Sequence, residues 1–227
     1  MHHSTAWKRS WAVVALALLL AVGCNKGETA PGVTATVPGP SEAGRSPLPG
    51  ETRVPEEPHR PVVQIDTTLG TLTVELDVDR APVTVKNFLW YASNGTYQQT
   101  IFHQVVPGYV AIAGGYDATG QPRPTHIEIR NEAGNSLKNK RGTIAMARRP
   151  DVIDSSTSQF FFNLADNPHL DQKGSHSAEE FGYCVFGRVT DGMEVLDRIS
   201  SAEVTDKEGF PSTPASPIVV KSISRVK

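Results

Sequence analysis

The stretch "SQFFFNL", Ser158 to Leu164, is the most informative segment of this chain for its fold. It predicts a short strand in which Gln159, Phe161 and Asn163 point to one face and Phe160 and Phe162 to the other. One face can enter a core, and the other then carries an aromatic ring between two amides. Two interpretations follow. Either both faces are covered, or the outer face is a shallow apolar pocket rimmed by hydrogen-bond donors, which suits a peptide segment.

The segments around this strand predict a fold dominated by β-strands. Alternating apolar residues in residues 62–76 predict two strands around a turn near Leu69–Gly70. Further strands are predicted within residues 101–112, 142–147, 182–189 and 217–226, and helices within 82–93 and 191–199. These are about eight strands and two helices that do not alternate, which favours an antiparallel barrel or sandwich with helical caps.

The composition limits the class of protein. The 227 residues carry 22 basic and 24 acidic side chains, a balance that argues against a dedicated nucleic-acid binder. No histidines, cysteines or carboxylates are paired at the spacing of metal ligands, and no phosphate-binding or dinucleotide-binding motif occurs. We therefore expect no metal ion, no cofactor and no nucleic-acid partner.

Residues 1–24 are typical of an export signal. Lys8 and Arg9 form a short basic region, and the apolar run from Trp11 to Val22 follows. Twelve helical residues rise about 18 Å, too little to span a bilayer core of about 30 Å. The small residues before Cys24 resemble a lipobox, in which the cysteine is acylated and anchors the protein to a membrane. Ordinary cleavage, giving a soluble secreted protein, is the alternative.

Residues 25–60 are expected to form a linker and residues 61–227 a folded domain. Twelve of the 36 linker residues are proline or glycine, and large apolar side chains are nearly absent. Such a segment cannot bury enough surface to offset the entropy of ordering. The second cysteine, Cys184, lies in an apolar run and is expected to be a buried thiol.

Five segments of the domain resemble the cyclophilin family of peptidyl-prolyl isomerases in order and spacing. They are "VTVKNF", "GTYQQTIFHQVVPG", "GTIAMAR", "TSQFFFNLADNPHLD" and "FGYCVFGRVTDGMEVLDRI". The resemblance is strongest to the bacterial periplasmic branch and covers about Val62 to Val226. It implies an all-β-dominated fold, an eight-stranded antiparallel barrel capped by two helices, with the active site on the outer face. It also implies non-covalent, cofactor-free rotation of X–Pro bonds.

The resemblance also implies a set of substrate-binding residues. Phe161 matches the phenylalanine of the proline pocket, and Gln159 the glutamine of the site. His169 stands where many members have tryptophan or phenylalanine, and Tyr183 where some have histidine. The full set of substrate-binding candidates is Phe102, Tyr109, Val110, Ala147, Arg148, Gln159, Phe161, His169, Leu170 and Tyr183.

The chain departs from the family at the polar catalytic positions. Gln104 replaces the catalytic arginine after Phe-His, leaving Gln104 and His103 as the catalytic candidates. The glutamine before Gly-Gly is also missing, with Ile112 or Ala113 nearest its place, and the segment from Tyr109 to Gly114 counts one residue more than is usual.

An amide donates hydrogen bonds without the charge or forked geometry of a guanidinium. Losing a charge-assisted bond costs about 1.5–3 kcal/mol, which is roughly 10- to 150-fold in rate. Arg148 and Arg123 are the cations that could swing in to compensate. Two functions stay open: a slowed prolyl isomerase that assists folding in the cell envelope, and a proline-peptide-binding chaperone without useful catalysis. We expect a monomer that faces the periplasm and acts on proline-containing polypeptides.

Overall fold

The computed structural model describes residues 59–207 and 209–226. The predicted export signal, Cys24 and the linker up to residue 58 lie outside the described residues. The last two residues of the predicted linker contact the domain, since the carbonyl of His59 accepts from the Val78 amide at 3.1 Å and Arg60 pairs with Asp77 at 3.0 Å. Within the described ranges, no helix is long and apolar enough to cross a bilayer.

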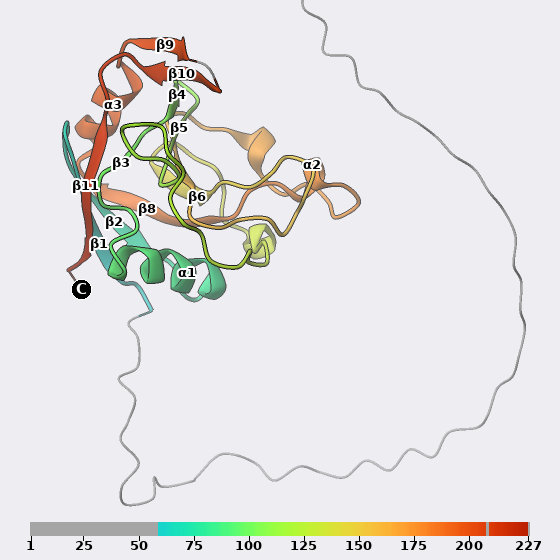
Figure 1. Ribbon diagram of the computed structural model, residues 1–227. Helices are drawn as coiled ribbons and strands as arrows, with labels where there is room; N and C mark the ends of the chain where they lie inside the picture. The colour runs from blue at the N-terminus through green and yellow to red at the C-terminus, as the bar shows by residue number, and fades with distance from the viewer. Residues whose placement is uncertain (1–58, 208, 227) are drawn as a thin grey trace, which may run out of the picture. The chain divides into compact units, whose positions relative to one another are not determined.

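Nine of the described strands form one curled antiparallel sheet (Figure 1). Their order is β3-β11-β1-β2-β8-β6-β7-β5-β4. Their bounds are β1 Val62–Thr67, β2 Gly70–Leu76, β3 Thr100–Ile101, β4 Gln104–Val106, β5 Val110–Ala113, β6 Thr143–Met146, β7 Phe160–Asn163, β8 Val185–Asp191 and β11 Val219–Arg225.

The two outer strands of the sheet, β3 and β4, belong to one stretch of chain. β3 pairs with β11 and β4 with β5. Between them, the Phe102 amide donates to the Ile218 carbonyl at 2.9 Å and the His103 amide to the Ile112 carbonyl at 3.1 Å. Residues 100–106 therefore join the two edges of the sheet. If β3 and β4 are counted as one strand, the sheet has eight strands. The predicted fold class is confirmed.

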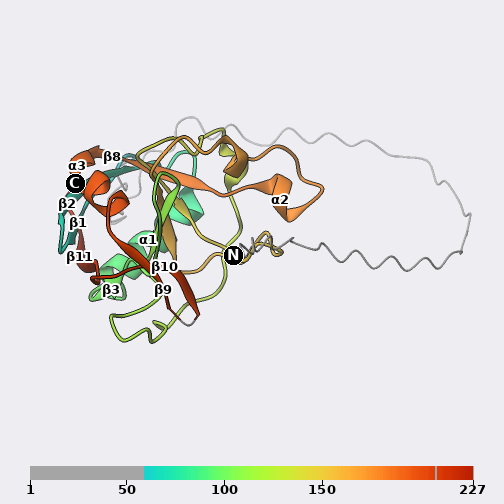
Figure 2. The same cartoon turned by 90° about the horizontal axis from the view of Figure 1, so that it is seen from above.

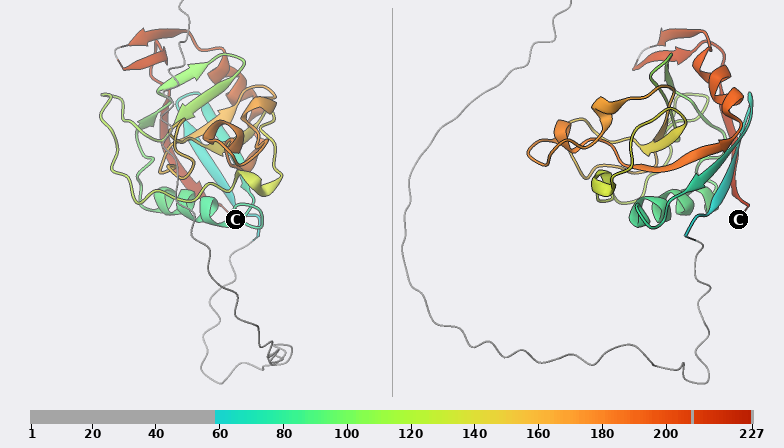
Figure 3. Two further views of the ribbon diagram at one scale, coloured as in Figure 1. Left: turned by 90° about the vertical axis from the view of Figure 1, so that its right-hand side faces the viewer. Right: turned by 180° about the vertical axis from the view of Figure 1, so that it is seen from behind.

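Helices α1 (Pro82–Ser93) and α3 (Met193–Ser200) are the two that were predicted. They lie toward opposite ends of the sheet (Figures 1 and 3). α3 begins later than predicted because Gly192, at φ 90°, precedes it as the N-cap. The described residues add a single turn, α2 (Ala178–Phe181), and two 3₁₀ turns, η1 (Ala133–Asn135) and η2 (Pro168–Leu170).

A separate hairpin, β9 (Val204–Lys207) and β10 (Phe210–Pro214), was not predicted. It packs beside β4, and its two strands are seen along their length in Figure 2. The segment is largely exposed and β10 contains two prolines, which weaken a strand signal. The sequence pattern therefore carried little sign of it.

The interior of the curled sheet is an aromatic core. Phe88 of α1 lies 5.5 Å from Phe160 and 5.2 Å from Phe186 between ring centroids. Phe160 packs edge-on against Phe162 at 5.9 Å, and all four rings are fully buried. The inward face of β7 is thus the one with Phe160 and Phe162, which leaves Phe161 for the outer face.

Candidate active site

A second apolar cluster, here called the outer cluster, lies on the other face of the sheet. It is laid out by strand register: Ile112 of β5 is opposite Phe161 of β7, Phe161 is opposite Ala145 of β6, and Ala145 is opposite Val185 of β8. Its buried members are Val110, Ala145, Phe161 and Val185, and its partly buried members are Tyr109, Ile112, Leu137, Ala147, Leu170 and Tyr183. Six of the ten predicted binding residues are therefore brought together.

Phe161 forms the floor of this cluster. Its side chain is 3% exposed, and the Tyr183 ring meets it edge-on at 5.7 Å and 81°. The prediction of an outward-facing aromatic is confirmed, because Phe161 belongs to the outer cluster and not to the core cluster. That this apolar patch is a shallow pocket rimmed by hydrogen-bond donors stays a prediction. Such a patch holds a small apolar ring through burial rather than through directional bonds.

Asn163, in contrast, does not rim the pocket. It is fully buried, donates to Asn139 Oδ1 at 3.1 Å and Thr143 Oγ1 at 2.9 Å, and accepts from Asn167 at 2.8 Å. Asn167 also donates to the Tyr109 carbonyl at 2.9 Å. The amide thus helps to position the Tyr109 wall, and both of its N–H donors are used inside the protein.

Tyr109 and His169 form one wall as a stacked pair. Their rings lie 5.3 Å apart with 17° between planes, and His169 Nε2 lies 3.2 Å from the Tyr109 hydroxyl. Partial burial, and then the nearby Tyr183 hydroxyl, raise the pKa of Tyr109. The stack makes a flat aromatic surface at the place where a larger ring is usual in the family.

Arg148 forms the opposite side with Tyr183. Its guanidinium carbon lies 4.5 Å from the Tyr183 ring centroid. Its nitrogens donate to the backbone carbonyls of Gly182 at 3.0 Å, Arg149 at 2.9 Å, Pro150 at 3.0 Å, and Ala178. Because these bonds occupy all three nitrogens, Arg148 is held in place and is poorly suited to swing toward Gln104.

Arg123 is likewise engaged. Its Nη2 donates to the Gln98 carbonyl at 2.9 Å, and its amide donates to the Gly115 carbonyl at 2.8 Å. Its Nε is buried without a partner among the described residues. Moving this side chain would break the bond to Gln98, so neither candidate cation is poised to replace the family arginine.

Gln104 lies on β4, directly opposite Ile112, and is partly exposed. The row Gln104, Ile112, Phe161 therefore runs across three neighbouring strands. In the described part of the chain, the Gln104 side-chain amide makes no hydrogen bond. Its N–H₂ is available to donate to a ligand at the edge of the outer cluster.

Ile112 occupies the second altered polar position. β5 pairs with β4 and β7 without a bulge from Val110 to Ala113. Ile112 belongs to the outer cluster, whereas Ala113 is fully buried in the core cluster. Of the two residues expected nearest to the place of the missing glutamine, Ile112 is therefore the one that belongs to the outer cluster.

Gln159 lies next to the cluster on the β7 side. Its side chain covers Gly115 so closely that a Cβ there would stand 2.7 Å from Gln159 Cδ. Its carbonyl accepts from the Ala147 amide at 2.9 Å. Gly115 thus leaves room for the predicted site glutamine.

Two predicted residues lie away from the outer cluster. Phe102 is 1% exposed in the core, 6.4 Å from the Phe162 ring. His103 faces the β9–β10 hairpin, with its ring 4.9 Å from Tyr116 and 6.1 Å from Phe210. Burial lowers the pKa of His103 to about 4. Neither side chain is placed to contact a ligand in the outer cluster.

Besides Ile112, three members of the cluster were not among the predicted binding residues. Ala145 and Val185 are the outward residues of β6 and β8, a signal that alternation along those strands could have supplied. Leu137 comes from a loop, and only the tertiary fold brings it here. In the described residues, no group of three or more histidines, cysteines or carboxylates could hold a metal ion.

This geometry defines a class of protein: a curled β-sheet with an apolar cluster on its outer face. Comparison with known proteins agrees. The family described as cyclophilin type peptidyl-prolyl cis-trans isomerase matches residues 62–225. The chain belongs to this family, and by homology it is a peptidyl-prolyl cis-trans isomerase.

Two relatives and two solved structures illustrate the similarity. The chain is 44% identical to peptidyl-prolyl cis-trans isomerase A of Dickeya dadantii over 73% of this chain and 84% of that protein. It is 39% identical to peptidyl-prolyl cis-trans isomerase B of Escherichia coli K12, over 72% and 98%. A cyclophilin-type isomerase of Cryptosporidium parvum matches at a TM-score of 0.61 with 26% identity, covering 74% and 98%. The same protein in the presence of the dipeptide Ala-Pro matches at 0.60.

Proposed function

We propose that this chain is an envelope-located prolyl isomerase whose rate is limited by the replacement of both polar partners at its site. The observation that carries the proposal is the row Gln104, Ile112, Phe161 across β4, β5 and β7. The apolar floor is intact, but a neutral amide and an alkyl group occupy the polar positions beside it.

Rotation of an X–Pro bond requires a site for the proline ring and a hydrogen-bond donor beside it. The X–Pro bond has partial double-bond character and a rotation barrier of about 18–20 kcal/mol. The outer cluster holds the proline ring by burial, and the preceding carbonyl rotates. As the amide twists, its nitrogen regains a lone pair, and a donor aimed at that nitrogen lowers the barrier. Gln104 can donate one neutral hydrogen bond there.

A second function follows from the same row. A site that keeps its apolar floor and loses its charged donor can still bind proline segments, which would make the chain a non-catalytic chaperone module. The structure of the Cryptosporidium relative in the presence of the dipeptide Ala-Pro supports proline peptides as ligands in either case. A prolyl-isomerisation assay on the purified protein separates the two, because a pure binder would show no rate above the uncatalysed one.

The location is inferred from the N-terminal sequence. Lys8, Arg9, the apolar run up to Val22 and Cys24 form an export signal with an acylation site. The proline-rich and glycine-rich linker then tethers the domain in the aqueous phase, where a monomer would meet unfolded chains. One acyl chain alone binds membranes marginally, so stable anchoring requires more than one chain on Cys24.

A further inference from the structure

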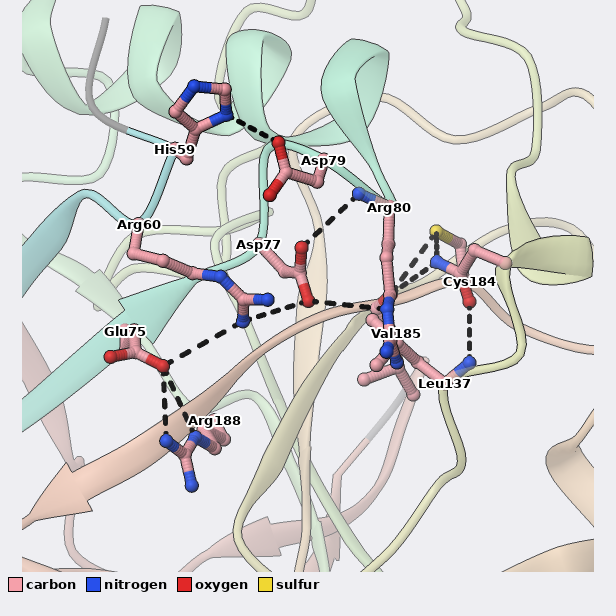
Figure 4. A network of polar contacts seen from close by, with 11 residues as sticks. His59, Arg60, Glu75, Asp77, Asp79, Arg80, Leu137, Cys184, Val185 and Arg188 are labelled. Atoms are coloured by element: carbon pink, nitrogen blue, oxygen red, sulfur yellow. Dashed lines mark hydrogen bonds and ion pairs between the residues drawn. The ribbon is translucent and has the colours of Figure 1, made fainter.

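A charged cavity adjoins the outer cluster along the same face of the sheet (Figure 4). It has a volume of about 180 Å³ and shares Leu137 and Val185 with the cluster. Its described lining, here called the arginine cavity, is Arg60, Glu75, Asp77, Arg80, Leu137, Lys138, Thr143, Val185, Gly187 and Arg188. A ligand in the outer cluster could therefore continue into it.

The carboxylates of the arginine cavity are covered and already paired. The Asp77 side chain is 5% exposed and lies 3.0 Å from Arg60 Nη1. Glu75 accepts from Arg188 Nη2 at 3.1 Å, with its side chain 25% exposed. Both carboxylates thus serve to hold arginines in place.

The cations, in contrast, face solvent. The side chains of Arg60, Arg80 and Arg188 are 48%, 51% and 67% exposed. Arg80 Nε lies 3.9 Å from Asp77, too far for a hydrogen bond. In Figure 4 the Arg80 side chain extends toward Val185, at the border of the two sites. Three guanidiniums share two carboxylates, so the cavity presents excess positive charge and unoccupied N–H donors.

Lys138, which also lines the cavity, adds no unpaired charge, because its amino group lies 3.6 Å from Asp171. The excess therefore resides on the guanidiniums, whose forked donors match a carboxylate in a bidentate way. In an unmodified polypeptide, the carboxylates of Asp and Glu are the side chains that meet this chemistry.

We propose that the arginine cavity binds an acidic side chain of the client polypeptide while its proline lies in the outer cluster. This inference rests on the proposed function and names a substrate class for the same site. Phe161, Ala145 and Val185 lie side by side on three neighbouring strands, and Arg188 is opposite Thr143, two residues from Ala145 along β6. At about 4.8 Å between strands and roughly 3.3 Å per residue, Phe161 and Arg188 are about 12 Å apart. An extended client chain covers that span in about three to four residues, so the acidic residue lies about three or four positions from the proline.

The test compares peptides that share one X–Pro bond and carry Glu or Gln two, three or four residues before or after the proline. The kcat/KM for isomerisation by the purified protein should favour Glu over Gln by about two- to fivefold at one of these positions, since exposed ion pairs are weak. The preference should shrink in 1 M salt, where the Debye length is about 3 Å.

Variants locate the effect. Arg80→Gln and Arg188→Gln should bring the Glu-to-Gln ratio close to one. Arg141→Gln should leave the ratio unchanged, because Arg141 is an equally exposed arginine that pairs with Asp197 and does not line the cavity. All three positions are exposed, and thermal melting checks that each variant is folded.

The outcomes separate the two proposals. A ratio of one at every position, with isomerisation proceeding, overturns the arginine cavity as a subsite and leaves the isomerase proposal standing. If Arg141→Gln loses the preference for Glu to the same extent, the subsite is also overturned, because the preference would then come from the electrostatic potential of the whole surface rather than from the cavity. Absence of isomerisation with every peptide counts against the proposed function. In that case the binding affinities of the labelled Glu and Gln peptides, measured by fluorescence anisotropy, test the arginine cavity separately: tighter binding of the Glu peptide supports it, and equal affinities overturn it.

Discussion

Gln104 and Ile112 lie directly opposite each other on β4 and β5. The two positions that are altered relative to the family are therefore immediate neighbours at the edge of the outer cluster. Their replacement leaves one face of the site without charge, while the aromatic and aliphatic residues around Phe161 are assembled as a binding surface.

Gln104→Arg should raise kcat/KM for prolyl isomerisation at least several-fold and at most roughly 150-fold. The introduced guanidinium would add a charge-assisted hydrogen bond worth about 1.5–3 kcal/mol in the twisted state. Gln64→Arg, at an exposed position of β1, is the matched control and should not change the rate. A wild-type rate equal to that of Gln104→Arg would show that Gln104 is not limiting.

Ile112→Gln should act mainly in combination with Gln104→Arg. Alone, it exchanges apolar contact within the outer cluster for an amide, and we expect little gain in rate. Together, the two changes should exceed the product of their separate effects, because the residues are direct cross-strand partners. A double-mutant cycle on kcat/KM measures this coupling, and strictly additive effects would argue against a shared role.

Leu170→Ala should weaken binding of a proline peptide several-fold. Leu170 is a partly buried member of the outer cluster, and its removal takes away apolar area from the wall. Leu69→Ala removes a similarly placed leucine from the core cluster and should lower thermal stability without changing peptide affinity. Isothermal titration with both variants makes the comparison. If Leu170→Ala binds the peptide as tightly as Leu69→Ala does, Leu170 is not part of the binding site.

His103 should make the domain sensitive to acid. Its folded-state pKa is lowered by burial from 6.5 to about 4, so the unfolded state binds the proton first as the pH falls. Stability is therefore lost between about pH 6.5 and 4, by about 2 kcal/mol at pH 4.5. His103→Phe, packed between Tyr116 and Phe210, should remove that part of the pH dependence. Urea unfolding at pH 7 and 4.5 measures both proteins, and an unchanged slope in the variant would contradict the assignment to His103.

Cys24 should carry the lipid anchor. Metabolic labelling with a fatty acid should mark the wild-type protein and leave Cys24→Ser unlabelled. Cys184→Ser is the control and should be labelled normally, since the Cys184 thiol is buried and its pKa is raised by burial to about 12. A label that persists in Cys24→Ser would rule out acylation at that residue.

The sequence by itself determined which residues of the β7 strand share a face and which family the chain resembles. Alternation in "SQFFFNL" separates Phe161 from Phe160 and Phe162 because side chains of a strand point alternately to its two faces. Five ordered motifs then sufficed for the fold. These signals are local, so no tertiary contact was needed to see them.

Only the tertiary structure decided how the polar groups are placed. It holds Arg148 on backbone carbonyls, sets Ile112 rather than Ala113 on the outer face, and turns His103 toward the hairpin. It also brings Arg60, Arg80 and Arg188 to one cavity. These arrangements depend on strand register and on contacts between residues far apart in the chain, which a linear pattern of residue types does not specify.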